Sequence, residues 1–415
     1  MHFSENIVQF EFAGTTMIGN LDNGYSIGLS NSGKTICQRL FRENVQAEEL
    51  NILDRELFQH LLKGSFFSKE TTGMQLESAY IHVTQRCNLS CIGCYSHADK
   101  RNESKEPSTE DIYRVISELA DAGVNTLIVS GGEPFLRDDL HKILRYAKYA
   151  KKINSITVAT NGCFINETTI SRLQPYVDCV SVSFDGASDD SIPYIRKTQL
   201  FNRLVRAVEI LKNLSIPVQI TPTLHSKNHD EMGHYVQLAA RLGATLNYSI
   251  FSCSPKTRNI RALIPSEEDL KKIGRMIFEQ GMHSRVSASN LPASLNLTVK
   301  NGCGAGRQNV SIASDGSVYP CHMLHNESHV MGNIFSEDLG PIIKRYTNRF
   351  LTSNAICKSC TSCNFLWLCG GGCKARSIYS YGNLAAQDPY CAMFKSFYSS
   401  FSEFLKQNVT AHQGG

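Results

Sequence analysis

The sequence has no hydrophobic run that approaches the roughly 18 residues of a membrane-spanning helix. Its first residues, MHFSENIVQFEF, have neither the basic nor the apolar segment of a secretion signal. An excess of one charge is also absent, because 42 basic and 38 acidic side chains leave a formal charge of only +4. That balance does not indicate nucleic acid or an anionic membrane as the main partner. We therefore expect a soluble, cytoplasmic protein that binds neither nucleic acid nor membrane.

Cysteine, in contrast, is abundant, with 15 residues of this type among 415. In a reducing cytoplasm this number argues against structural disulfides and favours metal or cluster ligation. Seven cysteines precede residue 303, three of them in CNLSCIGC at residues 87–94, and the other eight lie between Cys303 and Cys391. The hydrophobic share of 42% is that of a globular protein, and this length predicts two or three domains.

Residues 1–72 are predicted to form a small domain of three strands followed by three helices. The short β-rich runs VQFEF, TTMIGNL and YSIGL are separated by Gly, Asn and Asp, as in a three-stranded meander. SNSGKTICQRLF then begins with helix-capping residues, and AEELNIL and DRELFQHLLKG follow as two short helices. This order predicts a winged-helix-like domain.

Residues 73–254 alternate between strand-like and helix-like segments. Six β-rich runs, AYIHVT, NTLIVS, SITVAT, CVSVSF, PVQITPTL and TLNYSIF, are separated by amphipathic stretches such as STEDIYRVISELADAG. Such alternation is typical of parallel strands with helical crossovers. We therefore expect an α/β fold, a partial (β/α)6 barrel of the TIM type. Residues 255–300 form a link with a helix at SEEDLKKIGRMIFEQG, and residues 301–415 form a Cys-rich domain with few long periodic segments, held by metal.

The notable motifs all follow predicted barrel strands, where barrels of this type carry their chemistry. CNLSCIGC follows the first strand, GGEP at 131–134 the second, TNG at 160–162 the third, and SFDG at 183–186 closes the fourth. Cys87, Cys91 and Cys94 place three thiolates on one short loop. A cubane iron–sulfur cluster needs four iron ligands, so one iron would be open to a ligand that is not a cysteine. A structural zinc loop with a distant fourth ligand is the alternative.

This set of motifs resembles that of the radical S-adenosylmethionine (SAM) enzymes. The resemblance implies that Cys87, Cys91 and Cys94 bind a 4Fe–4S cluster whose fourth iron is chelated by the amino and carboxylate groups of SAM. It further implies that an electron from the cluster cleaves SAM to a 5′-deoxyadenosyl radical, which abstracts a substrate hydrogen. Many members carry an aromatic residue just before the third cysteine, against the adenine; here Gly93 stands there and Tyr95 follows the cysteine.

The same resemblance implies the residues that bind SAM. Gly131, Gly132 and Glu133 would hold the methionine ammonium, and glycines suit this role because the backbone must approach the ligand closely. A strand-to-helix turn is the alternative reading of GGEP. The remaining SAM contacts implied are Asn161 and Ser183 near the ribose and Arg196 near the methionine carboxylate.

The C-terminal cysteines resemble the SPASM extension of radical SAM enzymes, which binds two auxiliary clusters. The resemblance implies an outer cluster at Cys360, Cys363, Cys369 and Cys391, and an inner cluster at Cys303, Cys321 and Cys373. Some relatives have a further cysteine shortly before the first, but LNLTVKNGC has none. The inner cluster would therefore have an open iron or recruit Cys357. In total we expect SAM and three iron–sulfur clusters, all 4Fe–4S.

The N-terminal domain resembles the PqqD-like recognition element of peptide-modifying enzymes, which binds a leader peptide as an added strand. Together the resemblances imply a maturase of a ribosomally made precursor peptide, served by an electron donor such as a flavodoxin or ferredoxin. The bond expected is a thioether from a substrate cysteine to a peptide carbon, and an open inner iron would suit a substrate thiolate.

Other functions remain open at this point. A carbon–carbon or carbon–oxygen crosslink and an epimerisation are compatible with the same motifs. An anaerobic sulfatase maturase is disfavoured, since that group carries an Asp as general base after the YPC segment, where this chain has His322, the one candidate catalytic residue. An iron–sulfur electron-transfer protein without catalysis would leave GGEP, TNG and SFDG unexplained. The substrate peptide, the electron donor and the oligomeric state are not indicated by the sequence.

Overall fold

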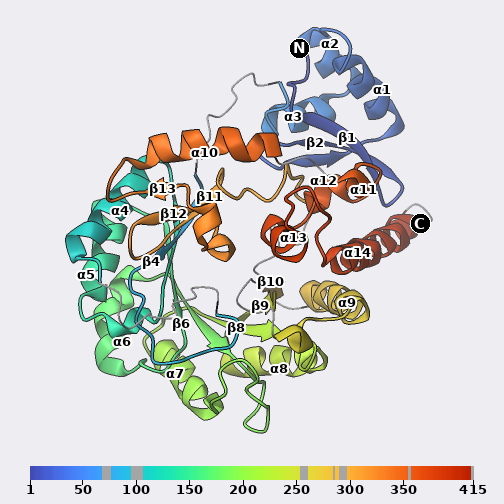
Figure 1. Cartoon of the computed structure of the whole chain (residues 1–415). Coiled ribbons are helices and arrows are strands. Elements are labelled where there is room, and N and C mark those ends of the chain that lie inside the picture. The colour runs from blue at the N-terminus through green and yellow to red at the C-terminus, as the bar shows by residue number, and fades with distance from the viewer. Residues whose placement is uncertain are drawn as a thin grey trace.

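The computed structural model describes residues 1–67, 76–94, 106–252, 260–283, 286–288, 297–353 and 357–412. Figure 1 shows a small N-terminal domain standing beside a large curved sheet, whose outer face is lined by helices. None of the described helices combines the length and hydrophobicity that a membrane crossing requires.

The N-terminal domain has the predicted order of three strands and three helices. Its antiparallel sheet has the order β1-β2-β3, and its own core includes Ile18, Leu40 and Leu61. Side chains cap two of its helices, because Ser30 accepts a hydrogen bond from the N–H of Gly33 and Asp54 one from Leu57. The elements are β1 Ile7–Phe12, β2 Thr15–Asn20, β3 Ser26–Gly28, α1 Asn31–Leu40, α2 Ala47–Leu53 and α3 Arg55–Lys63.

The predicted partial barrel is confirmed, with six parallel strands, β4 to β9, in sequence order. The strands are β4 Ser78–His82, β5 Thr126–Ser130, β6 Ser155–Thr160, β7 Cys179–Phe184, β8 Val218–Leu224 and β9 Thr245–Ile250. The helices on their outer face are α4 Thr109–Asp121, α5 Leu140–Arg145, α6 Glu167–Leu173, α7 Phe201–Asn213 and α8 Met232–Leu242. A π-helical turn at Tyr146–Ala150 continues α5, and α6 is a helix that the sequence did not reveal.

Burial alternates along these strands with a period of two. The buried positions, such as Ile156, Val180 and Ile220, face the helices and belong to the main hydrophobic core. The half-exposed positions between them, such as Thr157, Ser181 and Gln219, line the concave face of the sheet. The core therefore lies between sheet and helices, and the inside of the partial barrel is left open and polar.

The C-terminal region differs from the prediction, because it is joined to the barrel and contains long helices. Strand β11 (Asn309–Ile312) pairs in parallel with β4, and β10 (Val286–Ala288) pairs with β9, so that the sheet has ten strands. The other elements are α9 Glu267–His283, β12 Ser317–Tyr319, β13 Gly332–Asn333, α10 Leu339–Ser353, α11 Lys358–Thr361, α12 Leu366–Cys369, α13 Lys374–Tyr381 and α14 Cys391–His412. The sequence predicted few long periodic segments here, and the region has two long helices, α10 with 15 residues and α14 with 22.

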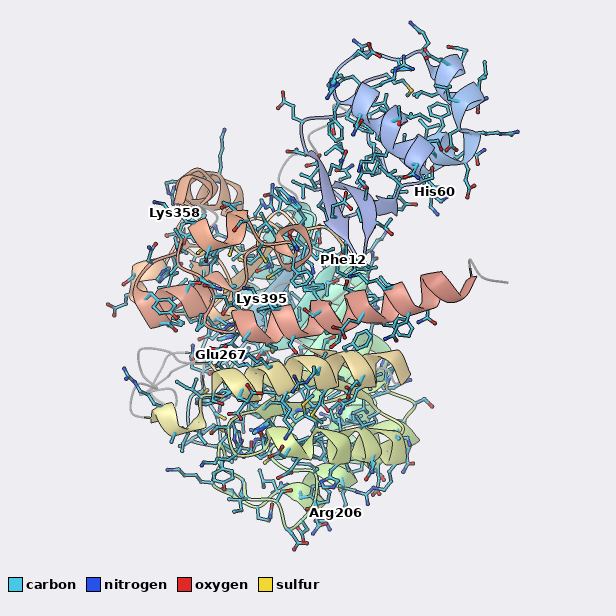
Figure 2. All side chains as sticks on the ribbon, turned by 90° about the vertical axis from the view of Figure 1, so that its right-hand side faces the viewer. Phe12, His60, Arg206, Glu267, Lys358 and Lys395 are labelled. Carbon is cyan, nitrogen blue, oxygen red and sulfur yellow. The ribbon has the colours of Figure 1, made fainter. Side chains whose placement is uncertain are left out.

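Two long helices hold the C-terminal region in place. Helix α14 runs beside α9 in both views (Figures 1 and 2), and Phe278 of α9 stacks edge to face with Phe397 of α14 at 5.9 Å between ring centroids. These residues join the same hydrophobic core as the barrel strands. Packing of apolar faces, and not metal alone, therefore stabilises this part of the chain.

The N-terminal domain docks on the C-terminal region through the tip of its β1–β2 hairpin. Phe12, labelled in Figure 2, is 4% exposed and packs against the rings of Phe365, Tyr398 and Phe401. Beside β3, the N–H of Val299 donates to the carbonyl of Gly24 at 3.0 Å. The domain thus has its own core but is anchored by an aromatic contact.

Candidate active site

A cavity of about 410 Å³ occupies the concave face of the barrel. Its wall at the carboxyl ends of the strands includes the three cysteines of the first motif, Cys87, Cys91 and Cys94. His322 and Met323, which directly follow Cys321, form part of the wall as well. One cavity therefore joins the loop expected to hold the first cluster to the segment beside an expected auxiliary-cluster ligand.

The loop with the first three cysteines is fixed by backbone contacts to neighbouring loops. The N–H of Ile92 donates to the carbonyl of Ile195 at 2.8 Å, and Gly93 has a φ of 72°, which glycine adopts without strain. Burial raises the pKa of the Cys91 thiol to about 11, and the nearby charge of Arg196 opposes this shift. An arginine facing the thiols is the kind of group that stabilises thiolate ligands.

The glycines of GGEP have a structural role that the sequence analysis did not predict. A Cβ on Gly131 would lie 2.3 Å from the carbonyl oxygen of Thr84, and one on Gly132 would lie 1.9 Å from that of Arg86. The N–H of Gly132 donates to Thr84 and that of Glu133 to Arg86. Both glycines also line the cavity. The close approach that requires glycine here is to the chain leading into the cysteine loop.

Glu133 is fully buried and is not part of the cavity wall. Its carboxylate accepts hydrogen bonds from the Thr160 hydroxyl at 2.7 Å and from the N–H of Asn161 at 2.8 Å. Burial raises the pKa of Glu133, and these hydrogen bonds together with the charge of Arg196 oppose the rise. The side chain therefore ties GGEP to TNG and acts as a positioning group in this structure.

The other predicted SAM-binding residues gather at the cavity mouth. Asn161 donates to Asn88 Oδ1 at 2.8 Å, Ser183 donates to the carbonyl of Thr160 at 3.3 Å, and Arg196 is 7% exposed. Asp185, which the sequence analysis did not single out, accepts a 2.6 Å hydrogen bond from the N–H of Arg196. Its place in SFDG could have identified Asp185 as a site residue, since this motif lies at the carboxyl end of a barrel strand.

Cys303, Cys321 and Cys373 come together as the predicted inner set. Burial raises the pKa of Cys321 most strongly, and the charges of Cys373 and Cys303 raise it further, which places the three thiols near one another. The charge of Cys303 likewise raises the pKa of Cys373. Cys321 of this set directly precedes His322, which lines the cavity.

Cys360, Cys363, Cys369 and Cys391 form the second group. Cys360 is near Cys391 and Cys363, and Cys369 is near Cys391, since each charge raises the pKa of its neighbour after burial has done so. Cys357 lies beside Cys360 in this outer group and hydrogen-bonds to Ser359 at 3.0 Å. Its position does not favour the idea that Cys357 completes the inner set.

Two buried cations lie among these cysteines. Arg376, 1% exposed, donates to both carboxylate oxygens of Asp388 at 2.8 and 2.5 Å, and Asp388 also accepts from the N–H of Cys373 at 2.7 Å. Lys300 donates to the carbonyl of Leu368 at 2.8 Å, and burial lowers its pKa to about 8 while the charge of Cys369 opposes this. No motif in the sequence marked these residues.

His322 stacks on the ring of Tyr80 at 4.3 Å between centroids, and both line the cavity. Burial lowers the pKa of His322 to about 4, so that the imidazole is neutral at pH 7. His82 lies close by, and burial together with the charge of His322 lowers its pKa to about 3. The one catalytic candidate from the sequence is therefore at the cavity, as a neutral ring.

The remaining cysteines and Tyr95 have mixed positions. Cys37 and Cys163 are buried as small apolar residues, whereas Cys179 is half-buried, and Cys253 and Tyr95 lie outside the described residues. None of the described cysteines is in a disulfide. Within the described part of the chain, no three His, Cys, Asp or Glu side chains are placed to hold a single metal ion. A cubane spreads its ligands over four irons, and the cysteine groups above fit it by donor type and proximity.

Comparison with known proteins identifies the family. The radical SAM superfamily matches residues 81–239, and the iron–sulfur cluster-binding SPASM domain matches residues 303–364. The mycofactocin maturase MftC of Mycolicibacterium smegmatis is 30% identical over 320 residues, covering 74% of this chain and 81% of the relative. The AdoMet-dependent heme synthase of Methanosarcina barkeri is 27% identical, covering 74% and 94%.

Two further comparisons extend this similarity. The PqqA peptide cyclase of Ruegeria pomeroyi is 27% identical, covering 75% of this chain and 85% of the relative. The structure of SuiB from Streptococcus suis with the precursor peptide SuiA has the same fold, with a TM-score of 0.64, 16% identity, and coverage of 94% and 99%. The chain therefore belongs to the radical SAM superfamily, is an enzyme that uses SAM and iron–sulfur clusters, and carries the SPASM cluster-binding domain.

Proposed function

We propose that this enzyme modifies a ribosomally made precursor peptide by linking a cysteine sulfur to a peptide carbon in a thioether. The observation that carries the proposal is that one continuous cavity extends from the Cys87–Cys94 loop to the residues that follow Cys321. A peptide carbon in that cavity would lie between the site of hydrogen abstraction and the inner cluster. The relatives named as a peptide cyclase and a maturase support a peptide substrate.

The residues at the cavity mouth are proposed to hold the cofactor. Cys87, Cys91 and Cys94 would ligate the first cluster, which together with SAM supplies a carbon radical able to remove a hydrogen atom. Arg196, whose guanidinium also donates to the carbonyl of Asn161 at 3.4 Å, would pair with the methionine carboxylate. Glu133 would act through Asn161, by holding the loop that faces the ribose, and Gly131 and Gly132 would present backbone groups to the ammonium.

The inner set is proposed to receive the substrate sulfur. Cys303, Cys321 and Cys373 provide three thiolates for a cluster of four irons, and the described residues offer no fourth cysteine there. The substrate thiol would lose its proton on binding the open iron. A cluster held by these residues would supply a site for the substrate thiolate and an acceptor for one of the two electrons released when the C–S bond forms, while the radical derived from SAM would take the other together with the hydrogen of the peptide carbon. A flavodoxin or ferredoxin is the class of donor that would supply the electron for SAM cleavage.

The N-terminal domain is proposed to bind the leader of the precursor. Strands β1 and β3 are the two edges of its sheet, and an extended peptide can add to such an edge. The same domain exposes large apolar side chains on α2 and α3, namely Ile52 at 83%, Leu53 at 50% and Leu62 at 49%. In the proposal these exposed side chains would add apolar contacts to the bound leader.

Two experiments test the leader proposal. Deleting residues 1–72 should leave SAM cleavage largely intact and remove most modification of a leader-bearing peptide. Supplying the domain in trans should restore little, because the effective concentration within one chain is lost. Since Phe12 is part of the contact with α14, the gentler variant Ile52→Asp with Leu62→Asp should weaken leader binding without exposing that contact. Tyr381→Asp is the control, because Tyr381 is an exposed hydrophobic residue outside the N-terminal domain. Equal modification by all variants would refute the proposal.

The bond itself is tested by adding candidate precursor peptides, with and without cysteine, to the reconstituted enzyme. A peptide with cysteines should lose the mass of two hydrogen atoms, and its thiol should no longer react with an alkylating reagent. Carbon–carbon or carbon–oxygen crosslinking would give the same mass change with the thiol still reactive. Epimerisation would leave the mass unchanged in light water and would add deuterium in heavy water.

A further inference from the structure

The concave face of the barrel has an unusual composition for a parallel barrel. The interior of a closed TIM barrel is packed with bulky branched side chains. Here most inward positions of four neighbouring strands, β6 to β9, are polar, with Ala159 as an exception, and the polar residues that line the cavity include Ser181, Gln219, Thr221 and Asn247. Apolar side chains of the same strands, such as Ile156, Val180 and Ile220, point the other way, into the core.

These polar side chains are organised in two hydrogen-bonded pairs. The hydroxyls of Ser181 on β7 and Thr221 on β8 are 2.9 Å apart, and Nδ2 of Asn247 on β9 donates to Oε1 of Gln219 on β8 at 3.2 Å. Because Oε1 of Gln219 is engaged by Asn247, its Nε2 is the donor that the side chain offers to another group. Each pair joins adjacent strands, so that the side chains are held in place before a ligand arrives.

Each pair has one member that lies deeper in the barrel than Ser183, a residue proposed to bind SAM. Ser181 and Gln219 are opposite each other in the strand register, and so are Ser183 and Thr221, two positions nearer the carboxyl ends. Two strand residues correspond to about 7 Å. Ser181 and Gln219 therefore lie below the level of Ser183, away from the mouth, whereas Thr221 and Asn247 lie level with it. These four side chains are called the deep layer below.

The deep layer is polar but carries no formal charge. Among the residues described as lining the cavity, the Asp, Glu, Lys and Arg side chains are Asp185 and Arg196, and both belong to the loop after β7 at the mouth. A charged group placed against the deep layer would lose water without gaining a counter-ion, which is costly. An apolar group would leave the amide of Gln219 without a partner, which is also unfavourable.

We propose that the deep layer recognises an amide of the substrate, through Gln219–Asn247 and Ser181–Thr221. An amide carries a donor and an acceptor in one plane, and amide and hydroxyl side chains can pair with both. The amide belongs either to an Asn or Gln side chain or to the peptide backbone. This inference rests on the proposed function, because it names the chemical class that a peptide substrate presents below the reacting carbon.

The test is equilibrium binding of three small probes to the reconstituted holoenzyme with SAM present. The probes are acetylated tripeptide amides, Gly-X-Gly, with Asn, Leu or Asp at X, and the readout is the Kd from calorimetry. The Asp probe should bind about tenfold more weakly than the Asn probe. A side-chain amide at the site predicts that Asn binds tighter than Leu by a similar factor, whereas a backbone amide predicts equal binding of Asn and Leu.

Substitutions in the deep layer complete the test. Gln219→Leu should weaken the favoured probe about tenfold, and Ser181→Ala with Thr221→Val is a second variant that is independent of the first. Thr126→Val, on an inward position of β5 outside the cavity wall, is the matched control and should change nothing. SAM affinity and iron content should be unchanged in all of them.

Three results would overturn the inference: unchanged probe affinity in both deep-layer variants, tightest binding of the Asp probe, or a loss of SAM affinity, which would assign the layer to the cofactor. These outcomes are separable from failure of the proposed function. If the probes bind as expected but no precursor peptide is modified, the amide site stands and peptide maturation fails. If the deep-layer variants modify precursor peptides as well as the wild type does, peptide maturation stands and the amide site fails.

Discussion

The cysteine loop of the barrel and the cysteine region of the C-terminus hold the same kind of ligand in different ways. Cys87, Cys91 and Cys94 lie on a loop at the carboxyl ends of the barrel strands. The loop is fixed by backbone hydrogen bonds and by the close approach of Gly132 to Arg86. The C-terminal cysteines alternate with core residues, and Cys373 is itself tied to the buried Asp388. Loss of a ligand should therefore affect chemistry in the first region, and folding as well in the second.

The two regions also differ in the charges around their thiols. At the barrel mouth Arg196 faces the cavity, where a cofactor carboxylate can pair with it. In the C-terminal region Arg376 is paired inside the protein with Asp388, and Lys300 is engaged by the carbonyl of Leu368. Cations that are already paired stabilise a permanent structure, whereas one that faces a cavity is available to a ligand.

The largest effect expected is that of Cys91→Ala, which should abolish SAM cleavage. With two of its three protein ligands left, the first cluster should be labile or absent, so that about four irons are lost. Because this loop is outside the core, the unfolding transition should change little. Formation of 5′-deoxyadenosine, iron content and thermal unfolding measure this, and cleavage near the wild-type rate would show that the cluster is held elsewhere.

Cys363→Ala combined with Cys369→Ala should separate the role of the C-terminal cysteines from that of the barrel loop. The variant should lose about four irons, keep some SAM cleavage and stop peptide modification, because only the outer cluster is removed. In contrast to Cys91→Ala, it should also unfold at a lower temperature, since these cysteines lie within the packed C-terminal region. Zinc in place of iron after anaerobic purification would contradict the assignment of an auxiliary cluster.

Arg376→Met should destabilise the C-terminal region by about 3–5 kcal/mol, because it leaves Asp388 charged, buried and without its cation. The double variant Arg376→Met, Asp388→Leu removes both charges and should recover most of the loss. Denaturant unfolding of the holoenzyme measures both. Equal stability of the single and double variants would mean that the ion pair is not what holds this segment.

Gly132→Ala should displace the barrel loop, because the added Cβ would meet the carbonyl oxygen of Arg86. We expect a loss of about 1–3 kcal/mol in stability together with weaker SAM binding. Gly233→Ala in α8 is the control, since a Cβ there has nothing within 4 Å and alanine favours helices. Wild-type SAM affinity in Gly132→Ala would show that the loop tolerates the displacement.

The smallest effect concerns His225, whose pKa burial lowers to about 4, with the charge of His229 adding to the shift. Between the unfolded pKa of about 6.5 and about 4, the unfolded chain binds a proton that the folded chain does not. The free energy of unfolding should therefore fall as pH decreases through this window, by about 1.4 kcal/mol from this residue at pH 5.5.

His225→Asn should remove that part of the pH dependence. The asparagine oxygen can accept the hydrogen bond that Nδ1 of His225 now accepts from the N–H of Lys227 at 3.1 Å. Denaturant midpoints at pH 7 and pH 5.5 for the two proteins measure the difference. An identical pH slope would show that His225 does not remain neutral.

The sequence predicted well those features that repeat or that have a fixed spacing. Six strands with a period of two gave the partial barrel, and the three-strand, three-helix order of the N-terminal domain was confirmed. The positions of Cys87 and Asn161 at one cavity followed from their places after parallel strands, because those ends meet at the same edge of a sheet. Arg196, which lines the same cavity, was expected there from the family resemblance alone. Chemistry tied to local spacing is therefore readable without a structure.

The features that the sequence did not predict depend on contacts between distant segments. Strand β11 pairs with β4, which lies more than two hundred residues earlier, and no local pattern announces such a partner. The same is true of Lys300, which meets Leu368, and of Phe12, which packs on Tyr398. The close approach of the GGEP glycines to Thr84 and Arg86 was likewise not predicted, because it depends on tertiary packing.

The most direct test of the account uses the reconstituted enzyme and a candidate precursor peptide, labelled with deuterium at candidate carbons. We predict that one labelled peptide transfers deuterium into 5′-deoxyadenosine and loses the mass of two hydrogens, with its thiol blocked. Formation of unlabelled 5′-deoxyadenosine from every labelled peptide, with all peptide masses unchanged, would contradict the proposal that the cavity between the two cysteine regions is the site of peptide modification.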